Sequence, residues 1–155
     1  KNVRNRGIIG DEVMGVYDRL HQILPGHPAK LFLLIGVNDV SHDLTTDTIV
    51  GMIRVTVERI RKESPDTKLY LQSLLPINES FGRYKRLAGK TNMIIPEINK
   101  QLEELAKEKG LTYINLFPLF TEKGSNVLRA ELTTDGLHLK EEGYKIWVKA
   151  IRKKI

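Results

Sequence analysis

The stretch "LFLLIGVND", residues 31–39, decides the fold of this chain. Its first five residues are all apolar, as expected of a β-strand that is buried on both faces. Strands of that kind belong to parallel sheets whose two faces are covered by helices. The glycine, Asn38 and Asp39 then follow at the point where such a strand ends. The stretch therefore predicts a central parallel strand that leads into a polar loop.

Short apolar runs alternate with amphipathic segments along the rest of the chain. The expected strands are Asn2–Asn5, Leu31–Ile35, Lys68–Gln72 and Thr112–Asn115. The expected helices are Glu12–Leu24, Thr46–Glu63, Met93–Lys109 and about Glu141–Lys153. The last of them is predicted to bury Tyr144, Trp147, Val148 and Ile151. This order predicts an α/β fold with a parallel sheet between two layers of helices, and ligands at the carboxyl ends of its strands.

Composition narrows the class of protein. A chain of 155 residues with 41% apolar content fits one domain, residues 1–155. The longest apolar run, Leu31–Val37, is far below the roughly 20 residues of a membrane span, so we expect a soluble chain, cytoplasmic or exported. With no cysteine, disulfide scaffolds, thiolate zinc sites and cysteine nucleophiles are excluded. The net charge of +6 is spread along the chain, which favours a solvated basic surface over a nucleic-acid interface.

Three stretches that carry polar residues fall where strands end or where a helix begins. In "NRGIIGDE", residues 5–12, the glycines could aim free backbone amides at a bound group, or serve the geometry of the turn alone. In "IGVNDVSHD", residues 35–43, Asn38 could donate its side-chain amide to an oxyanion, with Asp39 holding the loop; a simple Asx turn is the alternative. In "LTTDGLHLKEEGY", residues 132–144, Asp135 could orient His138 as a general base, or both could belong to a surface turn.

A long polar loop, Leu74–Lys90, separates two of the expected elements. Loops of this length are uncommon and often flank a site. Phe81, Arg83 and Tyr84 are therefore candidates for flanking a substrate, with a surface excursion as the alternative. Ser73 follows a strand, but no Gly-x-Ser-x-Gly elbow surrounds it, which argues against an α/β-hydrolase nucleophile there.

Taken together, "GD" at residues 10–11, "GVND" at 36–39 and "DGLH" at 135–138 resemble the SGNH hydrolases, also called the GDSL family of lipases and acylhydrolases. Within that family the chain is similar to bacterial platelet-activating-factor-acetylhydrolase-like proteins and carbohydrate O-acetylesterases. The resemblance implies a three-layer α/β/α, flavodoxin-like sheet of order 2-1-3-4-5. It also implies an esterase that works through an acyl-serine and needs no cofactor and no metal. Gly10 and Asn38 then match the oxyanion donors, His138 the general base and Asp135 the residue that orients it.

The family's Gly-Asp-Ser block has no counterpart in residues 1–155. We expect the nucleophilic serine, and the first strand that bears it, to lie upstream of residue 1, so that the domain is N-terminally incomplete and the chain alone is inactive. The missing strand is expected between Asn2–Asn5 and Leu31–Ile35. A smaller departure is Lys140, where the family often has a helix-capping Asn.

The expected partner is a small-molecule ester, with acetylated carbohydrates as first candidates; no nucleic acid is expected, and the oligomeric state is left open. Arg83, Lys85 and Arg86 could favour an anionic substrate. Two alternatives remain: an inert binding module of the same fold, and a metal-dependent hydrolase. The ligands of the latter would be Asp39, His42, Asp43, Asp135 and His138.

Overall fold

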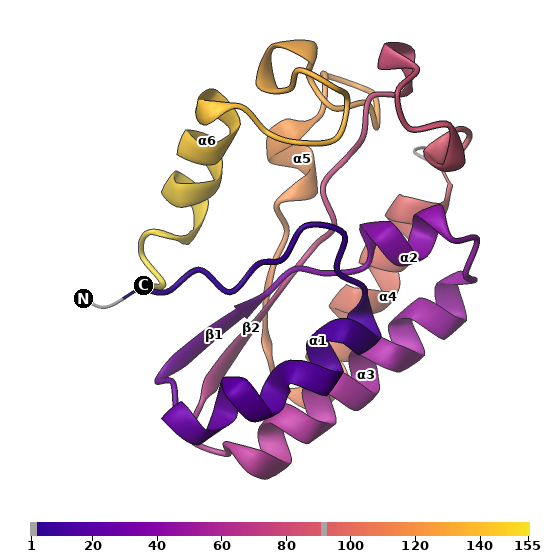
Figure 1. Cartoon of the computed structure of the whole chain (residues 1–155). Helices are drawn as coiled ribbons and strands as arrows, with labels where there is room; N and C mark the ends of the chain where they lie inside the picture. Colours follow the sequence, from indigo (N-terminus) through magenta and orange to yellow (C-terminus); the bar gives the residue numbers. More distant parts are fainter. Residues whose placement is uncertain (1–2, 91–92) are drawn as a thin grey trace.

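The computed structural model describes residues 3–90 and 93–155 (Figure 1). Its sheet contains β1 (Lys30–Leu33), β2 (Lys68–Gln72) and β3 (Thr112–Ile114), all parallel and in the order β1-β2-β3. Leu31 lies opposite Leu69 in the register, and Tyr70 lies opposite Thr112. The parallel α/β architecture is confirmed, and these strands match the last three positions of the expected sheet order.

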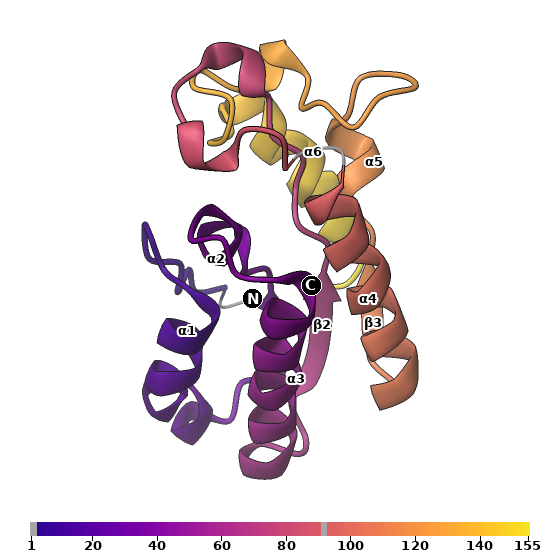
Figure 2. The same cartoon turned by 90° about the vertical axis from the view of Figure 1, so that its right-hand side faces the viewer.

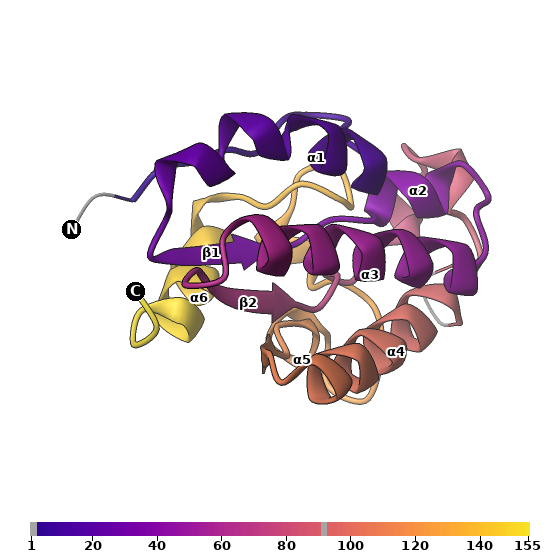
Figure 3. The ribbon, with the colours of Figure 1, turned by 90° about the horizontal axis from the view of Figure 1, so that it is seen from below.

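Helices cover both faces of the sheet. One core is built from the sheet and from α1 (Val13–Arg19), α3 (Thr46–Glu63) and α4 (Ile94–Lys109). Seen from below, α3 lies between α1 and α4, and it contacts both (Figure 3). A second, smaller core joins the other face to α5 (Phe117–Phe120) and α6 (Glu141–Ile151). The result is the three-layer arrangement that the sequence predicts.

The helix α3 has the bounds that its sequence predicts. Its apolar residues recur at helical spacing and are fully buried: Ile49, Ile53, Val57 and Ile60. Thr45 caps the first turn, since its hydroxyl accepts a hydrogen bond from the Thr48 N–H at 3.2 Å. Pro65 follows the last turn and disfavours its continuation. The short helix α2 (Val37–Ser41) connects β1 to this element.

Two expectations about local structure are wrong. Of the strand expected at Asn2–Asn5, residues 3–5 are exposed and form no strand, while Asn2 lies outside the described residues. A strand exists only when a neighbour takes up its backbone hydrogen bonds, and the described sheet offers none to this segment. The helix expected to reach Leu24 ends as α1 at Arg19 and continues as two 3₁₀ turns, Leu20–Gln22 and Leu24–Gly26.

The buried side of α6 also differs from expectation. Tyr144 and Val148 are each 54% exposed, whereas Ile146, Trp147 and Ala150 pack on the second core. The Trp147 indole N–H donates to the Gln72 side chain at 2.8 Å, which turns this side of the helix toward the end of β2. As expected from Lys140, the N-cap of α6 makes no side-chain hydrogen bond. Within residues 3–90 and 93–155, no helix is both long and apolar enough to cross a membrane.

Candidate active site

The loop that carries Asp135 and His138 is closed by its own backbone. Thr133 and Leu139 form an antiparallel bridge, and the Lys140 N–H donates to the Leu132 carbonyl at 2.8 Å. Inside the loop, Asp135 Oδ1 accepts the N–H of Leu137 at 2.9 Å and that of His138 at 2.8 Å, which is an Asx turn. One carboxylate oxygen is thus used to shape the loop, and the other remains for the imidazole.

The second oxygen of Asp135 lies against the His138 ring. Asp135 Oδ2 is 2.7 Å from His138 Nδ1; the aspartate side chain is 11% exposed and the histidine side chain 60%. Burial raises the pKa of Asp135, but hydrogen bonds from the His138 ring and from the Leu137 N–H outweigh it and hold the pKa well below its usual range. A carboxylate that stays ionised beside Nδ1 favours the tautomer with a proton on Nδ1, and Nε2 is then free to accept one. We call Asp135 and His138 the dyad.

The long loop after β2 reaches the dyad through Tyr84. The Tyr84 hydroxyl donates to Asp135 Oδ2 at 2.9 Å and lies 3.2 Å from His138 Nδ1. Phe81, on the same segment, is 39% exposed and packs beside Gly136, while Arg83 is exposed at its surface. Sequence reasoning marked Tyr84 as a residue that flanks a substrate, but it missed the contact with Asp135. Loop length was the only signal that pointed to this segment.

The two predicted oxyanion donors come from different segments: Gly10 lies in a second loop, residues 5–12, and Asn38 lies in α2. Gly10 has φ +78° in a turn closed by the Asp11 N–H and the Ile8 carbonyl at 3.3 Å, a conformation that favours glycine. Among the described residues, the Gly10 N–H makes no hydrogen bond. The Asn38 side-chain amide donates one of its two hydrogens to the Asp11 carbonyl at 2.7 Å. The Asn38 amide therefore contacts the residue that follows Gly10, and among the described residues its second hydrogen makes no hydrogen bond.

Buried and charged partners hold this second loop in place. Asp39 is 1% exposed, and its carboxylate accepts the Val13 N–H at 3.1 Å, so it holds the loop as expected. Burial raises the pKa of Asp39 above its usual value, although the hydrogen bond from Val13 opposes the shift. Arg19 pairs with Asp11 at 2.6 Å.

The dyad and the second loop belong to separate segments of the chain. Asn38 follows the carboxyl end of β1 and the segment of Tyr84 follows that of β2, which is where parallel α/β sheets place their ligands. Figure 2 shows residues 78–90 and 121–140 together above the sheet, and Lys90, at the end of the first segment, donates to the Val40 carbonyl of α2 at 2.7 Å. Among residues 3–90 and 93–155, no hydrogen bond joins Gly10 or Asn38 to the dyad.

The five candidate metal ligands do not gather at one point. Outside the dyad, Asp39 accepts from the Val13 backbone, His42 Nδ1 lies 2.8 Å from Glu12, and Asp43 pairs with Lys90. In the described part of the chain, no group of three or more His, Asp or Glu side chains is placed to share a metal ion.

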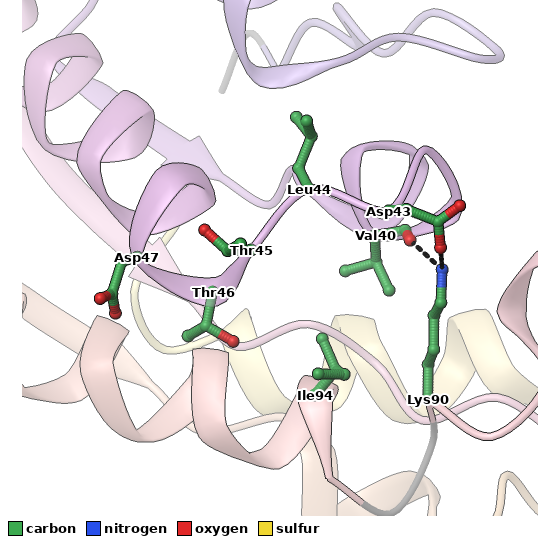
Figure 4. A pocket seen from close by; sticks show the side chains of 8 residues that line it. All are labelled: Val40, Asp43, Leu44, Thr45, Thr46, Asp47, Lys90 and Ile94. Atoms are coloured by element: carbon green, nitrogen blue, oxygen red, sulfur yellow. Dashed lines mark hydrogen bonds and ion pairs between the residues drawn. The ribbon is translucent and has the colours of Figure 1, made fainter.

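Two other polar features lie apart from the dyad. A cavity of about 470 Å³ lies between the start of α3 and the start of α4, and Lys90 crosses its rim to Asp43 and to the Val40 carbonyl (Figure 4). Ser73 is fully buried, and its hydroxyl accepts the N–H groups of Leu116 and Phe117 at 2.9 and 3.0 Å. This serine therefore shapes the turn into α5 and is not exposed for nucleophilic attack.

A sequence model of one family, the GDSL-like lipases and acylhydrolases, matches residues 1–146. The chain belongs to this family. A structure from Streptococcus pneumonia, provisionally named as a platelet activating factor, has 28% identity and a TM-score of 0.87, over 99% of this chain and 72% of that one. A GDSL-like lipase from Bacteroides thetaiotaomicron has 25% identity and a TM-score of 0.83, over 96% of this chain and 73% of that one.

Two further likenesses differ in what they show. An acetylxylan esterase from Geobacillus stearothermophilus, in a catalytic mutant form, has 18% identity and a TM-score of 0.77, over 96% of this chain and 70% of that one, and this likeness concerns the fold alone. The N-acylneuraminate cytidylyltransferase of Escherichia coli O18:K1:H7 (strain RS218) is 29% identical over 147 residues, which are 93% of this chain and 33% of that protein. The chain thus spans about a third of the length of this curated relative.

Proposed function

We propose that this GDSL-family chain is part of a serine esterase that hydrolyses short acyl esters through an acyl-serine. The observation that carries the proposal is the 2.7 Å contact between Asp135 Oδ2 and His138 Nδ1, in a histidine whose side chain is 60% exposed. This is the arrangement that a general base needs in order to take a proton from a hydroxyl nucleophile. Ester hydrolysis by such a base agrees with the family of the chain.

The proposed cycle moves one proton through His138. The serine oxygen attacks the ester carbonyl as its proton passes to His138 Nε2, and the tetrahedral intermediate then collapses and expels the alcohol, which takes that proton. A water molecule attacks the acyl-serine in the same way and releases the acid and the free serine. Asp135 keeps the proton of the ring on Nδ1 and balances the charge of the imidazolium without itself being protonated.

The oxyanion that forms in both steps needs donors. Gly10 N–H and the second hydrogen of the Asn38 amide are the proposed donors, together with the backbone amide of the nucleophile. We take the nucleophile to be the serine of the family's Gly-Asp-Ser motif, which has no counterpart in residues 1–155 and is expected upstream of them.

Acetyl esters of carbohydrates are the proposed substrates. The longest apolar run of the sequence leads through β1 to the start of α2, and no other apolar stretch is long enough to suggest a lid over a lipid tail. Arg83 and Arg86, which share the segment of Tyr84, would favour a substrate that carries a negative charge.

The test is p-nitrophenyl acetate hydrolysis by two forms of the protein, the 155-residue chain and one extended upstream through the Gly-Asp-Ser block. We expect activity in the extended form alone, its loss in His138→Ala and on treatment with a serine-directed phosphonate, and no effect of EDTA. His21→Ala is the matched control, because His21 is exposed and its ring contacts only the Asp18 carbonyl among the described residues. Activity in the 155-residue chain that disappears in His138→Ala would refute the upstream nucleophile, and inactivity of both forms would favour an inert module of this fold.

A further inference from the structure

The Tyr84 hydroxyl contacts both members of the dyad. It donates to Asp135 Oδ2 at 2.9 Å, and the same oxygen lies 3.2 Å from His138 Nδ1. The two rings meet edge to face, with centroids 5.9 Å apart and planes inclined by 65°. The phenol therefore stands on the carboxylate side of the imidazole, and among the described residues Nε2 makes no hydrogen bond.

Neighbouring residues, and not Tyr84 alone, hold the segment of Tyr84 in place. The Asn78 N–H donates to the Gly136 carbonyl at 2.8 Å, and the Asn78 side-chain amide donates to the Leu128 carbonyl at 2.8 Å. Leu87, three residues beyond Tyr84, is buried in the main core. Because both ends of the segment are fixed, the position of the hydroxyl is set by the fold.

The hydrogen bonds of Asp135 leave Tyr84 a specific task. Oδ1 accepts two backbone N–H groups, whereas Oδ2 faces the His138 ring and the Tyr84 hydroxyl alone among the described residues. If Oδ2 turned away from the ring, Nδ1 would lose the acceptor that keeps its proton there. A second donor on Oδ2 restrains that rotation. Burial and then the hydrogen bond to Asp135 raise the pKa of Tyr84, so the phenol remains a donor through the neutral range.

We propose that Tyr84 is a positioning residue of this site, whose hydroxyl holds the Asp135 carboxylate and through it keeps the His138 ring in the tautomer with Nε2 free. The proposal rests on the proposed function, since it concerns the same dyad. Tyr84 acts through Asp135 and has no direct part in the chemistry.

The test compares Tyr84→Phe, which removes only the hydroxyl, with Tyr144→Phe, which removes the hydroxyl of an exposed tyrosine on α6. The first readout is the downfield proton resonance of His138 Nδ1–H in the NMR spectrum, identified by its loss in His138→Ala. We expect this resonance to move upfield and to exchange faster with water in Tyr84→Phe, and to stay unchanged in Tyr144→Phe. This readout requires a folded protein but no turnover, so it tests Tyr84 even if the esterase proposal fails.

The second readout is steady-state hydrolysis of p-nitrophenyl acetate by the upstream-extended protein. We expect kcat to fall roughly tenfold in Tyr84→Phe at unchanged KM, in line with the loss of one hydrogen bond to a charged group. A resonance and a kcat that both match the wild type would overturn the proposal. A wild-type spectrum without the Nδ1–H resonance would also overturn it. A higher KM at unchanged kcat in Tyr84→Phe would overturn it too, because Tyr84 would then be a substrate contact. If Tyr84→Phe lowers the midpoint temperature of thermal unfolding, the spectrum is recorded well below that temperature, where the variant is folded.

Discussion

The side-chain amide of Asn38 donates to the Asp11 carbonyl at 2.7 Å, and this contact fixes the predicted oxyanion asparagine beside the loop of Gly10. The two residues are 27 positions apart in the chain. Asp39, the next residue, is buried and accepts the Val13 N–H, so adjacent side chains hold both ends of the same short segment. Oxyanion donors contribute most when they do not have to reorganise during the reaction, and this bracing would supply that rigidity to the proposed donors.

Asn38→Ala should therefore lower kcat for p-nitrophenyl acetate by about 100- to 1,000-fold in the upstream-extended protein, with a much smaller change in KM. The amide would be lost where negative charge develops, and the substrate's ground state depends on it less. Asn126→Ala, in the loop before η5 (Ala130–Leu132), is the control and should leave both constants as they are. A kcat close to that of the wild type would remove Asn38 from the oxyanion site.

Asp135→Asn should reduce kcat by at least about 1,000-fold, because an amide NH₂ turned toward Nδ1 favours the tautomer with the proton on Nε2. The side-chain oxygen of the new residue can still accept the backbone N–H groups of Leu137 and His138, so the loop should keep its shape. Circular dichroism verifies the fold, and steady-state kinetics measure the loss. A variant that retains most of the activity would contradict the proposed role of the dyad.

The low pKa of Asp135 predicts a dependence of stability on pH with a definite sign. Since hydrogen bonds in the folded state hold this pKa well below its usual range, the ionised carboxylate stabilises the folded protein above about pH 4. That contribution is lost as the pH falls further and the unfolded chain takes up a proton first. Urea unfolding, followed by the fluorescence of the single tryptophan, gives the free energy of unfolding. The difference in this free energy between wild type and Asp135→Asn should be larger at neutral pH than in acid.

The control for this measurement is Asp66→Asn, which changes an exposed carboxylate in the turn before β2. For Asp66→Asn, the difference from the wild type in the free energy of unfolding should not change with pH. If the Asp135→Asn difference is the same at neutral and acidic pH, Asp135 does not have the lowered pKa in the folded state.

The sequence predicts the features of this protein that depend on neighbouring residues in the chain. The bounds of α3 and β2 follow from local periodicity and breakers, and the dyad follows from a spacing of three residues within one turn. Local patterns do not predict features that depend on a residue far away in the chain. Tyr84 contacts Asp135, which is 51 positions away in the chain, from within a loop whose path no local pattern predicts.

Two of the three errors about local structure have the same origin. Tyr144 and Val148 carry apolar side chains on a helix with two possible apolar sides, and the contact of Trp147 with Gln72 decides which one is buried. Residues 3–5 were expected to belong to a strand, but a strand forms only where a neighbour pairs with it, and the described sheet gives this segment no neighbour. In both cases the structure depends on packing against distant residues, which the local sequence does not specify.

Asp39→Ala should destabilise the protein by about 1 to 3 kcal/mol, because the buried Val13 N–H would lose its acceptor. The loop of Gly10 should loosen as a result, and kcat should fall even though Asp39 touches none of the reacting atoms. Urea unfolding gives the free energy, and Asp66→Ala serves as an exposed control. An unchanged unfolding midpoint would show that the hydrogen bond to Val13 contributes nothing to the loop.

Gly136→Ala tests the docking of the Tyr84 segment on the dyad loop. Gly136 has φ +86°, and a Cβ atom there would come within 2.2 Å of the Asn78 carbonyl oxygen, so the two segments would have to separate. Gly124→Ala is the matched control, because Gly124 has φ +76° with open space around it. The control should lose about 1 to 2 kcal/mol from the backbone conformation alone. Gly136→Ala should lose about 1 to 3 kcal/mol more from the clash.

The two glycine variants also separate stability from catalysis. In Gly136→Ala the Asn78 to Gly136 hydrogen bond should break and carry Tyr84 away from Asp135, so the His138 Nδ1–H resonance should shift as it does in Tyr84→Phe. In Gly124→Ala the resonance should stay in place, since that turn lies outside the dyad loop. Equal losses of stability in the two variants, with an unshifted resonance in both, would show that the Tyr84 segment does not depend on its contact with Gly136.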